Sequence, residues 1–154
     1  MRYDIVADTH GHLSNELLEA LQGADIIVHA GDMCSGGDLR RLERIAPVYM
    51  CLGNNDWGYD YGPQIKRLTR FSREGMRWEI CHYEERLDLE TCEIAICGHT
   101  HRPFVERDKR TNTLVMNPGS PTFPRGGSGP TMGRIITYKG TVLSAGIIKL
   151  KRKD

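Results

Sequence analysis

The sequence predicts a single α/β domain whose first half is a sheet of parallel strands. The chain has 154 residues, close to the roughly 150 that one domain occupies. Its composition, 39% hydrophobic and 27% charged, is that of an ordinary globular protein. Up to Leu52, short apolar runs alternate with segments of helical periodicity, which is the pattern of a βαβαβ unit. We therefore expect one domain over residues 1–154.

Strand and helix signals alternate regularly in the first half. Each short apolar run bounded by polar or turn residues predicts a buried strand. Leu17, Leu18 and Leu21 would share one face of a helix. We expect Asp38 to cap a second helix and Pro47 to end it. The expected strands are 3–7, 25–30 and 48–52, and the expected helices are 13–21 and 38–46.

The second half changes to strands joined by tight turns. Met76, Trp78 and Ile80 alternate with polar residues, which is typical of a half-buried antiparallel strand. Turn-like segments at 72–75, 108–112 and 139–140 indicate hairpins, and the Gly-, Pro- and Ser-rich segment 118–132 predicts a loop. The expected strands are 65–71, 76–81, 94–97, 104–107, 114–117, 134–138 and 142–150.

Charge and cysteine content argue against several classes of protein. Lys plus Arg number 21 and Asp plus Glu number 20, so a net charge of +1 offers no field to hold nucleic acid or a membrane. No apolar run reaches the ~18 residues of a membrane helix, and the first residues show no export signal. Five cysteines without a CxxC pair are typical of free thiols in a reducing cytoplasm. The sequence leaves open whether the chain forms a homo-oligomer. Only Lys149, Lys151, Arg152 and Lys153 form a locally basic segment, which we interpret as a solvated end.

Polar motifs follow five of the expected strands. In open α/β sheets, the carboxyl ends of the strands are where sites assemble. We therefore expect these motifs to lie close together in space. They are Asp8-Thr9-His10, Gly31-Asp32, Gly53-Asn54-Asn55-Asp56, His82 and Gly98-His99-Thr100-His101.

Residue types and spacing in these motifs favour a metal site. Residues i and i+2 of an extended chain point to the same side, so Asp8 with His10, and His99 with His101, are expected to reach common points. Carboxylate, imidazole and amide ligands without thiolate suit Mn, Fe, Zn, Ni or Co. Each motif alone is more often an ordinary turn, and His29 alone is a core or rim residue. The combination of five motifs is what favours the metal interpretation.

The order D-x-H, G-D, G-N-x-D, H and G-H-T-H resembles the calcineurin-like metallophosphoesterase superfamily. Within it, the chain is similar to small bacterial and archaeal phosphodiesterases, which also carry (S/A)DTHG and N-P-G-S segments, the latter here at 117–120. The resemblance covers residues 3 to about 125. It implies a four-layer α/β/β/α sandwich of two mixed sheets, the metallo-dependent phosphatase fold. It also implies a phosphoric ester hydrolase that cleaves a small or nucleotide-like phosphodiester.

The resemblance further implies a ligand set for two divalent metal ions. Manganese is the first choice, with Fe, Zn, Ni or Co as alternatives. A hydroxide held between the ions would attack phosphorus, so no side chain is assigned as nucleophile. One ion would be held by Asp8, His10 and His101, the other by Asn54, His82 and His99, with Asp32 between them.

Some positions depart from the family pattern. Many phosphatases of the superfamily have a proton-donating His at the position of Asn55, and an amide cannot play that part. We expect substrates with good leaving groups to be favoured. After His82, Tyr83-Glu84 replaces Gly-His, so Tyr83 either crowds the pocket or stacks on an aromatic group. The stretch from 82 to 99 is short, which implies that one family helix is trimmed. Asn55 and Arg125 are the candidate substrate-binding residues, a solvated Arg125 being the alternative.

Three other functions compete with the phosphodiesterase interpretation. A nuclease of the same superfamily would need a basic track for a strand, which the near-neutral charge does not supply. A protein phosphatase would carry an Asp-Arg-Gly sequence shortly after Gly31-Asp32, where this chain has Met33 to Gly37. A scaffold protein of the same fold would have lost metal ligands, whereas every ligand type is present here. The phosphodiesterase interpretation is therefore preferred.

Overall fold

The computed structural model describes residues 1–151, so Arg152 and Lys153 of the basic segment lie outside the described residues. Two α-helices and two 3-10 turns accompany the strands in this part of the chain: α1 (Asn15–Leu21), α2 (Gly36–Glu43), η1 (Glu84–Arg86) and η2 (Leu89–Thr91). The strands are β1 (Arg2–Val6), β2 (Ile26–His29), β3 (Val48–Met50), β4 (Leu68–Arg73), β5 (Met76–Cys81), β6 (Ile94–Ile96), β7 (Phe104–Arg107), β8 (Leu114–Asn117), β9 (Thr131–Tyr138) and β10 (Thr141–Lys149).

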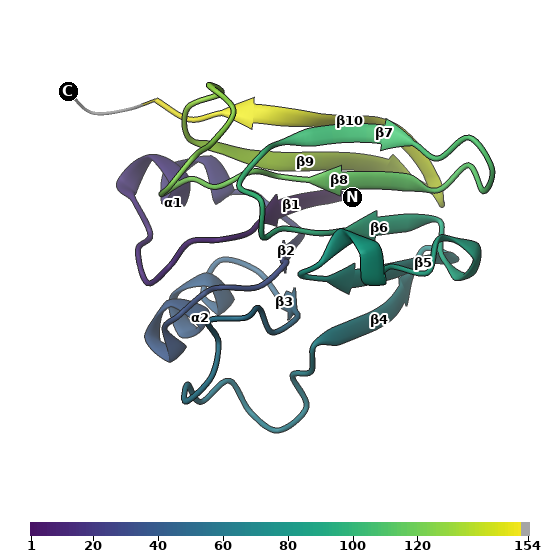
Figure 1. Ribbon diagram of the computed structural model, residues 1–154. Helices are drawn as coiled ribbons and strands as arrows, with labels where there is room; N and C mark the ends of the chain where they lie inside the picture. The colour runs from purple at the N-terminus through teal and green to yellow at the C-terminus, as the bar shows by residue number, and fades with distance from the viewer. Residues whose placement is uncertain (152–154) are drawn as a thin grey trace.

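These strands form two five-stranded mixed sheets (Figure 1). Sheet A has the order β10-β9-β1-β2-β3 and sheet B the order β4-β5-β6-β8-β7. The predicted βαβαβ unit is confirmed, because β1 pairs in parallel with β2 and β2 in parallel with β3. The β4–β5, β7–β8 and β9–β10 hairpins are also confirmed.

Alternation along the central strands divides the core into two layers. Ile5 and Val28 belong to the apolar cluster between the sheets, together with Trp78 of β5. Val6 and Ile27, each adjacent in sequence to one of these two residues, belong to the cluster under the helices. Because successive side chains of a strand point to opposite faces, β1 and β2 of sheet A are buried on both sides. These central strands therefore contain mostly apolar runs in the sequence.

The helices cover the outer face of sheet A, and their start signals are serines. Ser14 caps α1 by accepting a hydrogen bond from the Leu17 N–H at 3.1 Å. The prediction that Asp38 caps α2 was wrong, because Ser35 Oγ accepts the Asp38 N–H at 3.1 Å and the helix begins at Gly36. A serine oxygen can accept this bond before two glycines that enter the first turn.

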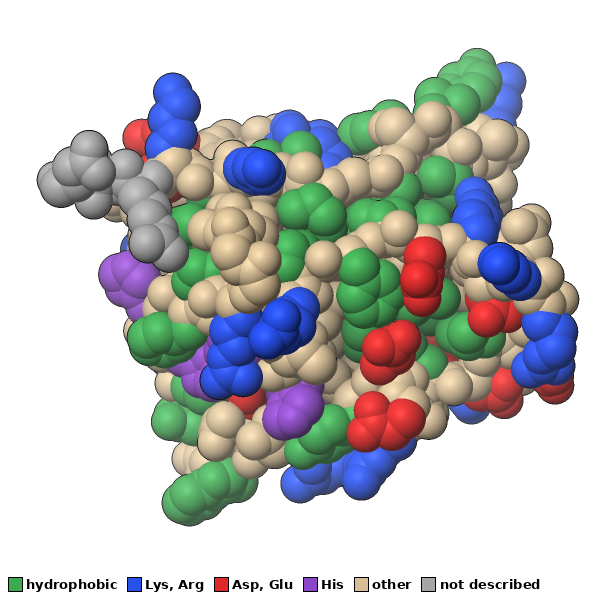
Figure 2. All heavy atoms as spheres, turned by 45° about the horizontal axis from the view of Figure 1, so that its top comes forward, with side chains coloured by type: hydrophobic (Ala, Val, Ile, Leu, Met, Phe, Trp, Pro, Cys, Tyr) green, Lys and Arg blue, Asp and Glu red, His purple; other side chains and the backbone are tan. Residues whose placement is uncertain are grey.

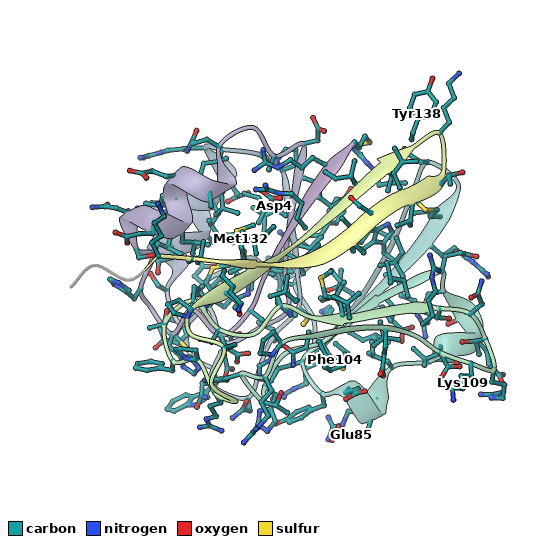
Figure 3. All side chains as sticks on the ribbon, turned by 90° about the horizontal axis from the view of Figure 1, so that it is seen from above. Asp4, Glu85, Phe104, Lys109, Met132 and Tyr138 are labelled. Carbon is teal, nitrogen blue, oxygen red and sulfur yellow. The ribbon has the colours of Figure 1, made fainter. Side chains whose placement is uncertain are left out.

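Within residues 1–151, the outer face of sheet B carries only the 3-10 turns. Leu87 and Leu89 pack there against Cys92, Ala95 and Val115. Figure 3 shows Asp4 on the helix side of sheet A and Glu85 on the short turn across sheet B. The predicted four-layer fold is thus confirmed, with its fourth layer trimmed to η1 and η2, as the short spacing between His82 and His99 indicated.

The structure also bears on the predicted environment of the protein. All five cysteines are free thiols. Among residues 1–151, no helix combines the length and the apolar character that crossing a bilayer requires.

Candidate metal centre

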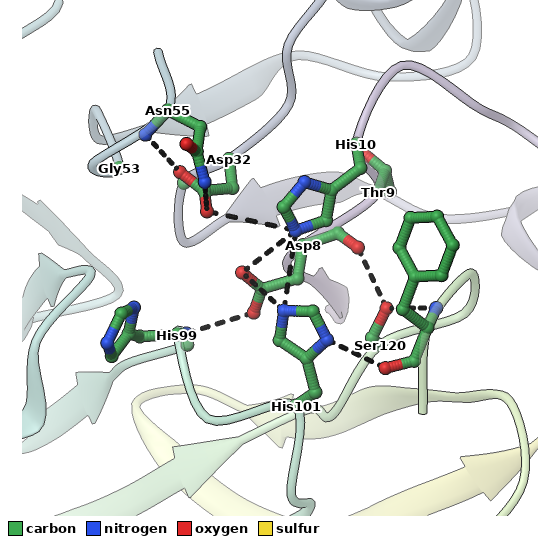
Figure 4. Close-up of polar contacts among 12 residues, drawn as sticks. Asp8, Thr9, His10, Asp32, Gly53, Asn55, His99, His101 and Ser120 are labelled. Carbon is green, nitrogen blue, oxygen red and sulfur yellow. Dashed lines mark hydrogen bonds and ion pairs between the residues drawn. The ribbon is translucent and has the colours of Figure 1, made fainter. Parts of the chain in front are cut away.

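The polar motifs after the strands meet in one place. Asp8 and His10 follow β1, Asp32 follows β2, His82 follows β5, and His101 follows β6. His101 Nε2 lies 3.4 Å from Asp8 Oδ1, and His82 Nε2 lies 3.4 Å from Asp32 Oδ2. His10 Nε2 lies 3.8 Å from each of these two carboxylate oxygens (Figure 4). Two carboxylates and three imidazoles therefore face one another, drawn from four strands of two sheets.

The backbone reaches this arrangement through unusual conformations. Five of the nine described non-glycine residues with positive φ are predicted metal ligands: Asp8, His10, Asp32, His99 and His101. Residues other than glycine in this region cost of order 1–3 kcal/mol each and gather at functional sites. The expectation of extended chain at Asp8-x-His10 was wrong, since φ is +56° and +50° there. The two side chains converge through a left-handed turn instead.

Gly31, next to the cluster, lets the backbone pass close to His82 and Gly53. Gly31 has φ +101°, and a Cβ atom on it would lie 2.7 Å from His82 Nδ1 and 2.8 Å from the Gly53 nitrogen. A side chain at this position would push His82 away from Asp32. The glycine of the Gly-Asp motif therefore has a packing role beside the ligands.

Backbone carbonyls orient the two most buried histidines of the cluster, His82 and His101. His82 Nδ1 donates to the Ala30 carbonyl at 2.8 Å, and His101 Nδ1 donates to the Phe123 carbonyl at 2.7 Å. Each bond places the proton on Nδ1 and leaves the Nε2 lone pair directed at Asp8 and Asp32. The same arrangement is typical of metal-binding histidines, whose second nitrogen is held by an outer partner.

Two buried atoms of the cluster lack a hydrogen-bond partner among the described residues. They are Asp8 Oδ1 and His82 Nε2, on side chains that are 0% and 1% exposed. An unpaired polar atom in a protein interior is costly, so a missing partner is indicated at this point. A divalent cation would be coordinated by both atoms.

The pKa values of His82 and His101 reflect the negative charge of the Asp8 and Asp32 carboxylates. For His82, burial disfavours the proton, but the nearby carboxylates of Asp32 and Asp8 prevail and raise the pKa. The Asp8 carboxylate, with Oδ1 3.4 Å from Nε2, raises the pKa of His101. For Asp32, burial is outweighed by the nearby His82 ring and by hydrogen bonds from Asn55, which hold the pKa of this carboxyl well below its usual range. The carboxylates thus attract positive charge, which a metal ion supplies.

Asn55 is the asparagine that reaches Asp32. Its backbone N–H donates to Asp32 Oδ1 at 2.8 Å and its side-chain amide donates to Oδ2 at 2.9 Å. Asn54 is exposed, and its side chain forms no hydrogen bond to the described residues. The predicted ligand role of Asn54 and the predicted substrate contact of Asn55 both stay predictions.

His99 and Arg125 lie at the rim of the cluster. The His99 N–H donates to Asp8 Oδ2 at 2.9 Å, while its exposed ring contacts the His82 ring, with 5.1 Å between centroids. Its ring thus lies beside His82, and the sharing of one ion by these two residues stays a prediction. Arg125 is exposed and its charge disfavours protonation of His101, which places it on that side of the site. Its substrate contact stays a prediction.

Two groups of possible ligands follow from these positions. In each group one ligand atom per residue lies within 4.8 Å of the others, and Asp8 belongs to both. The groups are Asp8, His10 and His101, and Asp8, Asp32 and His82. The first equals the predicted ligand set of one ion, and the second joins the predicted bridging residue to a ligand of the other.

Sequence reasoning missed the residues that hold the ligand loops. Buried Asp56 accepts the Asp32 N–H at 2.6 Å and the Gly53 N–H at 2.8 Å. Ser120 Oγ donates to the Asp8 carbonyl at 2.8 Å. Both belong to quoted motifs, G-N-x-D and N-P-G-S, so the motifs themselves were the available signal.

Two histidines stand apart from the cluster. His12 is exposed. His29 is fully buried, accepts the Gly31 N–H at Nδ1 over 3.1 Å and contacts Thr9 Oγ1 through Nε2 at 3.0 Å. Burial lowers the pKa of His29 to about 4, so it is neutral near pH 7. As the sequence indicated, His29 is a core residue.

Comparisons with known proteins give one family. The model of the calcineurin-like phosphoesterase superfamily domain matches residues 1–140. A probable metallophosphoesterase of Methanothermobacter thermautotrophicus is 32% identical over 97% of this chain and 92% of its own length. A phosphodiesterase of Methanocaldococcus jannaschii is 29% identical over 90% of this chain and 95% of its own length. The zinc complex of Vps29 from Entamoeba histolytica shares the fold, with a TM-score of 0.71 at 16% identity over 96% of this chain and 97% of that chain.

Proposed function

Because the chain belongs to the calcineurin-like phosphoesterase superfamily, we propose that it is a metal-dependent phosphodiesterase that hydrolyses a small or nucleotide-like substrate. The observation that carries this proposal is the pair of unpartnered buried ligand atoms, Asp8 Oδ1 and His82 Nε2, at the centre of a carboxylate–imidazole cluster. The phosphodiesterase relative supports the choice of diester over monoester. The free cysteines agree with activity in the cytoplasm.

The donor set fits two divalent cations, and we take manganese as the first candidate. Oxygen and imidazole ligands without thiolate suit this group of metals. When bound, the cations would supply Lewis acidity to the phosphoryl oxygens and lower the pKa of a water molecule. In the proposed assignment, one cation is held by Asp8, His10 and His101, the other by Asn54, His82 and His99, and Asp32 faces both.

The side chains around the ligands have separate tasks. The Nδ1 hydrogen bonds of His82 and His101 fix both rings, so their Nε2 atoms stay aimed at the carboxylates. Asn55 holds both oxygens of Asp32 and donates only neutral N–H bonds. Since an amide does not protonate a leaving group, we expect aryl phosphodiesters, whose leaving groups are acidic, to be cleaved faster than alkyl ones. Equal rates for the two would contradict this part of the proposal.

Hydrolysis of bis(4-nitrophenyl) phosphate by the manganese-loaded protein tests the function. We expect activity that a chelator removes and manganese restores, with a slower reaction on 4-nitrophenyl phosphate. Asp32→Asn should lower the rate below detection because it halves the anionic charge of the carboxylate pair. The exposed Asp25, at the opposite end of β2, gives the matched control Asp25→Asn, which should keep the activity.

The outcome separates this function from a scaffold role. Metal binding without hydrolysis of any phosphoester would show that this chain uses the fold for surface contacts only. Hydrolysis that Asp32→Asn leaves unchanged would reject the proposed role of the cluster.

A further inference from the structure

A small apolar pocket adjoins the candidate metal centre at His82. Its volume is about 260 Å³, close to the lower end of the range for small-molecule sites. Leu52, Leu68, Cys81 and Tyr83 supply its apolar and aromatic lining, and His82 belongs both to this lining and to the ligand cluster. The pocket therefore opens directly beside the position at which a phosphate group would be held.

Two sheets meet at this pocket, which fixes its shape. Leu52 follows β3 of sheet A, Leu68 begins β4 of sheet B, and Cys81 ends β5. The Leu52 N–H donates to the Lys66 carbonyl at 2.8 Å, and Thr69 Oγ1 donates to the Met50 carbonyl at 2.6 Å. These bonds tie the end of β3 to the beginning of β4. The pocket is therefore built on strand ends and is preorganised for a rigid ligand.

Tyr83 connects the pocket to the ligand histidines. Its ring lies edge-on to the His99 ring at 4.7 Å between centroids and to the His82 ring at 5.5 Å. Both histidines are assigned to the same cation in the proposed site. A group esterified to a phosphate at that cation would lie next to the Tyr83 ring. An aromatic side chain at this position favours a planar substituent, because rings gain from offset or edge contacts beyond their buried area.

Positive charge at the pocket points to an anionic ligand. Arg67 and Arg86 complete its lining, both are exposed, and neither forms an ion pair with the described residues. The Arg86 guanidinium lies over the Tyr83 ring, with Cζ 4.8 Å from the centroid. Guanidinium planes bind phosphates and stack on rings. Figure 2 shows histidine side chains reaching the surface near Lys and Arg side chains.

We propose that this pocket binds an aromatic ring carried by the phosphodiester substrate, with Tyr83 as its contact surface and Arg67 and Arg86 beside the phosphate. This inference deepens the proposed function, since it rests on a phosphate being held at the metal centre. It names the substrate class as aromatic phosphodiesters, in which a nucleobase or an aryl group lies within a few bonds of phosphorus. Tyr83 is then a specificity-determining residue.

Calorimetric binding to the manganese-loaded protein tests the inference without turnover. The probes form two pairs that differ by an aromatic ring: AMP with ribose 5-phosphate, and phenyl phosphate with methyl phosphate. We expect the ring to tighten binding about tenfold in at least one pair, within the range for stacking of a base on an aromatic side chain. An effect in the first pair alone assigns a nucleobase, and an effect in the second alone assigns an aryl ester.

Variants identify the pocket as the source of this preference. Tyr83→Ala should bring the ratio of dissociation constants close to one, and Tyr83→Phe should retain it. Leu68 is 38% exposed, so Leu68→Glu should fold and also lower the ratio by placing a carboxylate in the pocket. Tyr138, which is 60% exposed on the distant β9–β10 hairpin, gives the control Tyr138→Ala with an unchanged ratio.

The results separate failure of the pocket from failure of the function. Ratios near one in both pairs, or a ratio that survives in Tyr83→Ala, would overturn the pocket assignment even if the protein hydrolyses phosphodiesters. A Tyr83-dependent ratio in a protein that hydrolyses no diester would support the pocket and refute the proposed catalysis.

Discussion

Replacing Asp56 tests whether the ligand loops are held by one buried carboxylate. Asp56 is 5% exposed and accepts four hydrogen bonds. Its Oδ2 receives the N–H groups of Asp32 and Gly53 at 2.6 and 2.8 Å. Its Oδ1 receives the Cys34 N–H at 2.9 Å and the Tyr61 hydroxyl at 2.7 Å. Asp56→Asn is the sharpest perturbation, because it changes the acceptors and leaves the size of the side chain unchanged.

The expected loss of stability follows from these four bonds. The new amide group has two donors, so only one oxygen remains to accept. With the amide at the Oδ1 position, the Tyr61 hydroxyl can turn and accept, but the Cys34 N–H loses its partner. An unpaired group of this kind costs about 1–3 kcal/mol, and the surviving bonds lose the strength that a charged acceptor gives. We expect Asp56→Asn to lower the free energy of unfolding by about 3 kcal/mol, and Tyr61→Phe by about 1.5 kcal/mol.

Urea unfolding of the metal-free protein measures both values. Trp78 is 1% exposed in the core, so its fluorescence reports the transition. Asp56 also fixes the backbone of Asp32, so Asp56→Asn should weaken manganese binding by about 10- to 100-fold, as outer-shell changes do. The reasoning is refuted if Asp56→Asn unfolds at the wild-type urea concentration, or if it binds manganese with wild-type affinity.

Three further predictions concern stability. Because His29 is buried and neutral, the native protein takes up this proton only near pH 4, whereas the unfolded chain takes it up near pH 6.5. The free energy of unfolding should therefore fall by on the order of 3 kcal/mol as the pH drops between these two values. The metal-free His29→Gln variant should have a flatter pH dependence of its urea midpoint, and slopes equal to those of the wild type would contradict this. The buried Asp4 carboxylate pairs with Arg2 at 2.7 Å and Arg134 at 2.8 Å, and Asp4→Ala should cost about 3 kcal/mol in the same assay, an unchanged midpoint being the contrary result. Manganese at 100 times its dissociation constant should add about 2.7 kcal/mol to the wild type and much less to Asp32→Asn; equal gains would reject the ligand role.

Local sequence patterns were enough to predict most of the fold. The β7–β8 hairpin was predicted at its observed bounds, because its strands flank the turn segment 108–112. The parallel β1–β3 unit followed from apolar runs that are buried on both faces. Ser35 was missed as the cap of α2, because two glycines after it resembled a turn and Asp38 offered an equally good side chain.

The convergence of the site could be predicted, but its local geometry could not. The positions of Asp8, Asp32 and His82 at strand ends were sufficient to bring them together. The left-handed backbone at Asp8 and His10 depends on contacts from distant segments, such as the hydrogen bonds of the Asp8 and His10 N–H groups to the Gly31 and Asp32 carbonyls. Such long-range pairings leave no pattern in a single local sequence. The reach of Asn55 to Asp32 likewise depends on how the loop after β3 folds.

Anomalous diffraction from manganese-loaded crystals is the most direct test of the metal centre. Peaks are expected within coordination distance of Asp8 Oδ1 and His82 Nε2, the two buried atoms that lack partners. One peak should also touch His10 and His101, and the other Asp32. Manganese peaks only at other places in the crystal, or none under saturating manganese, would contradict the account of this site.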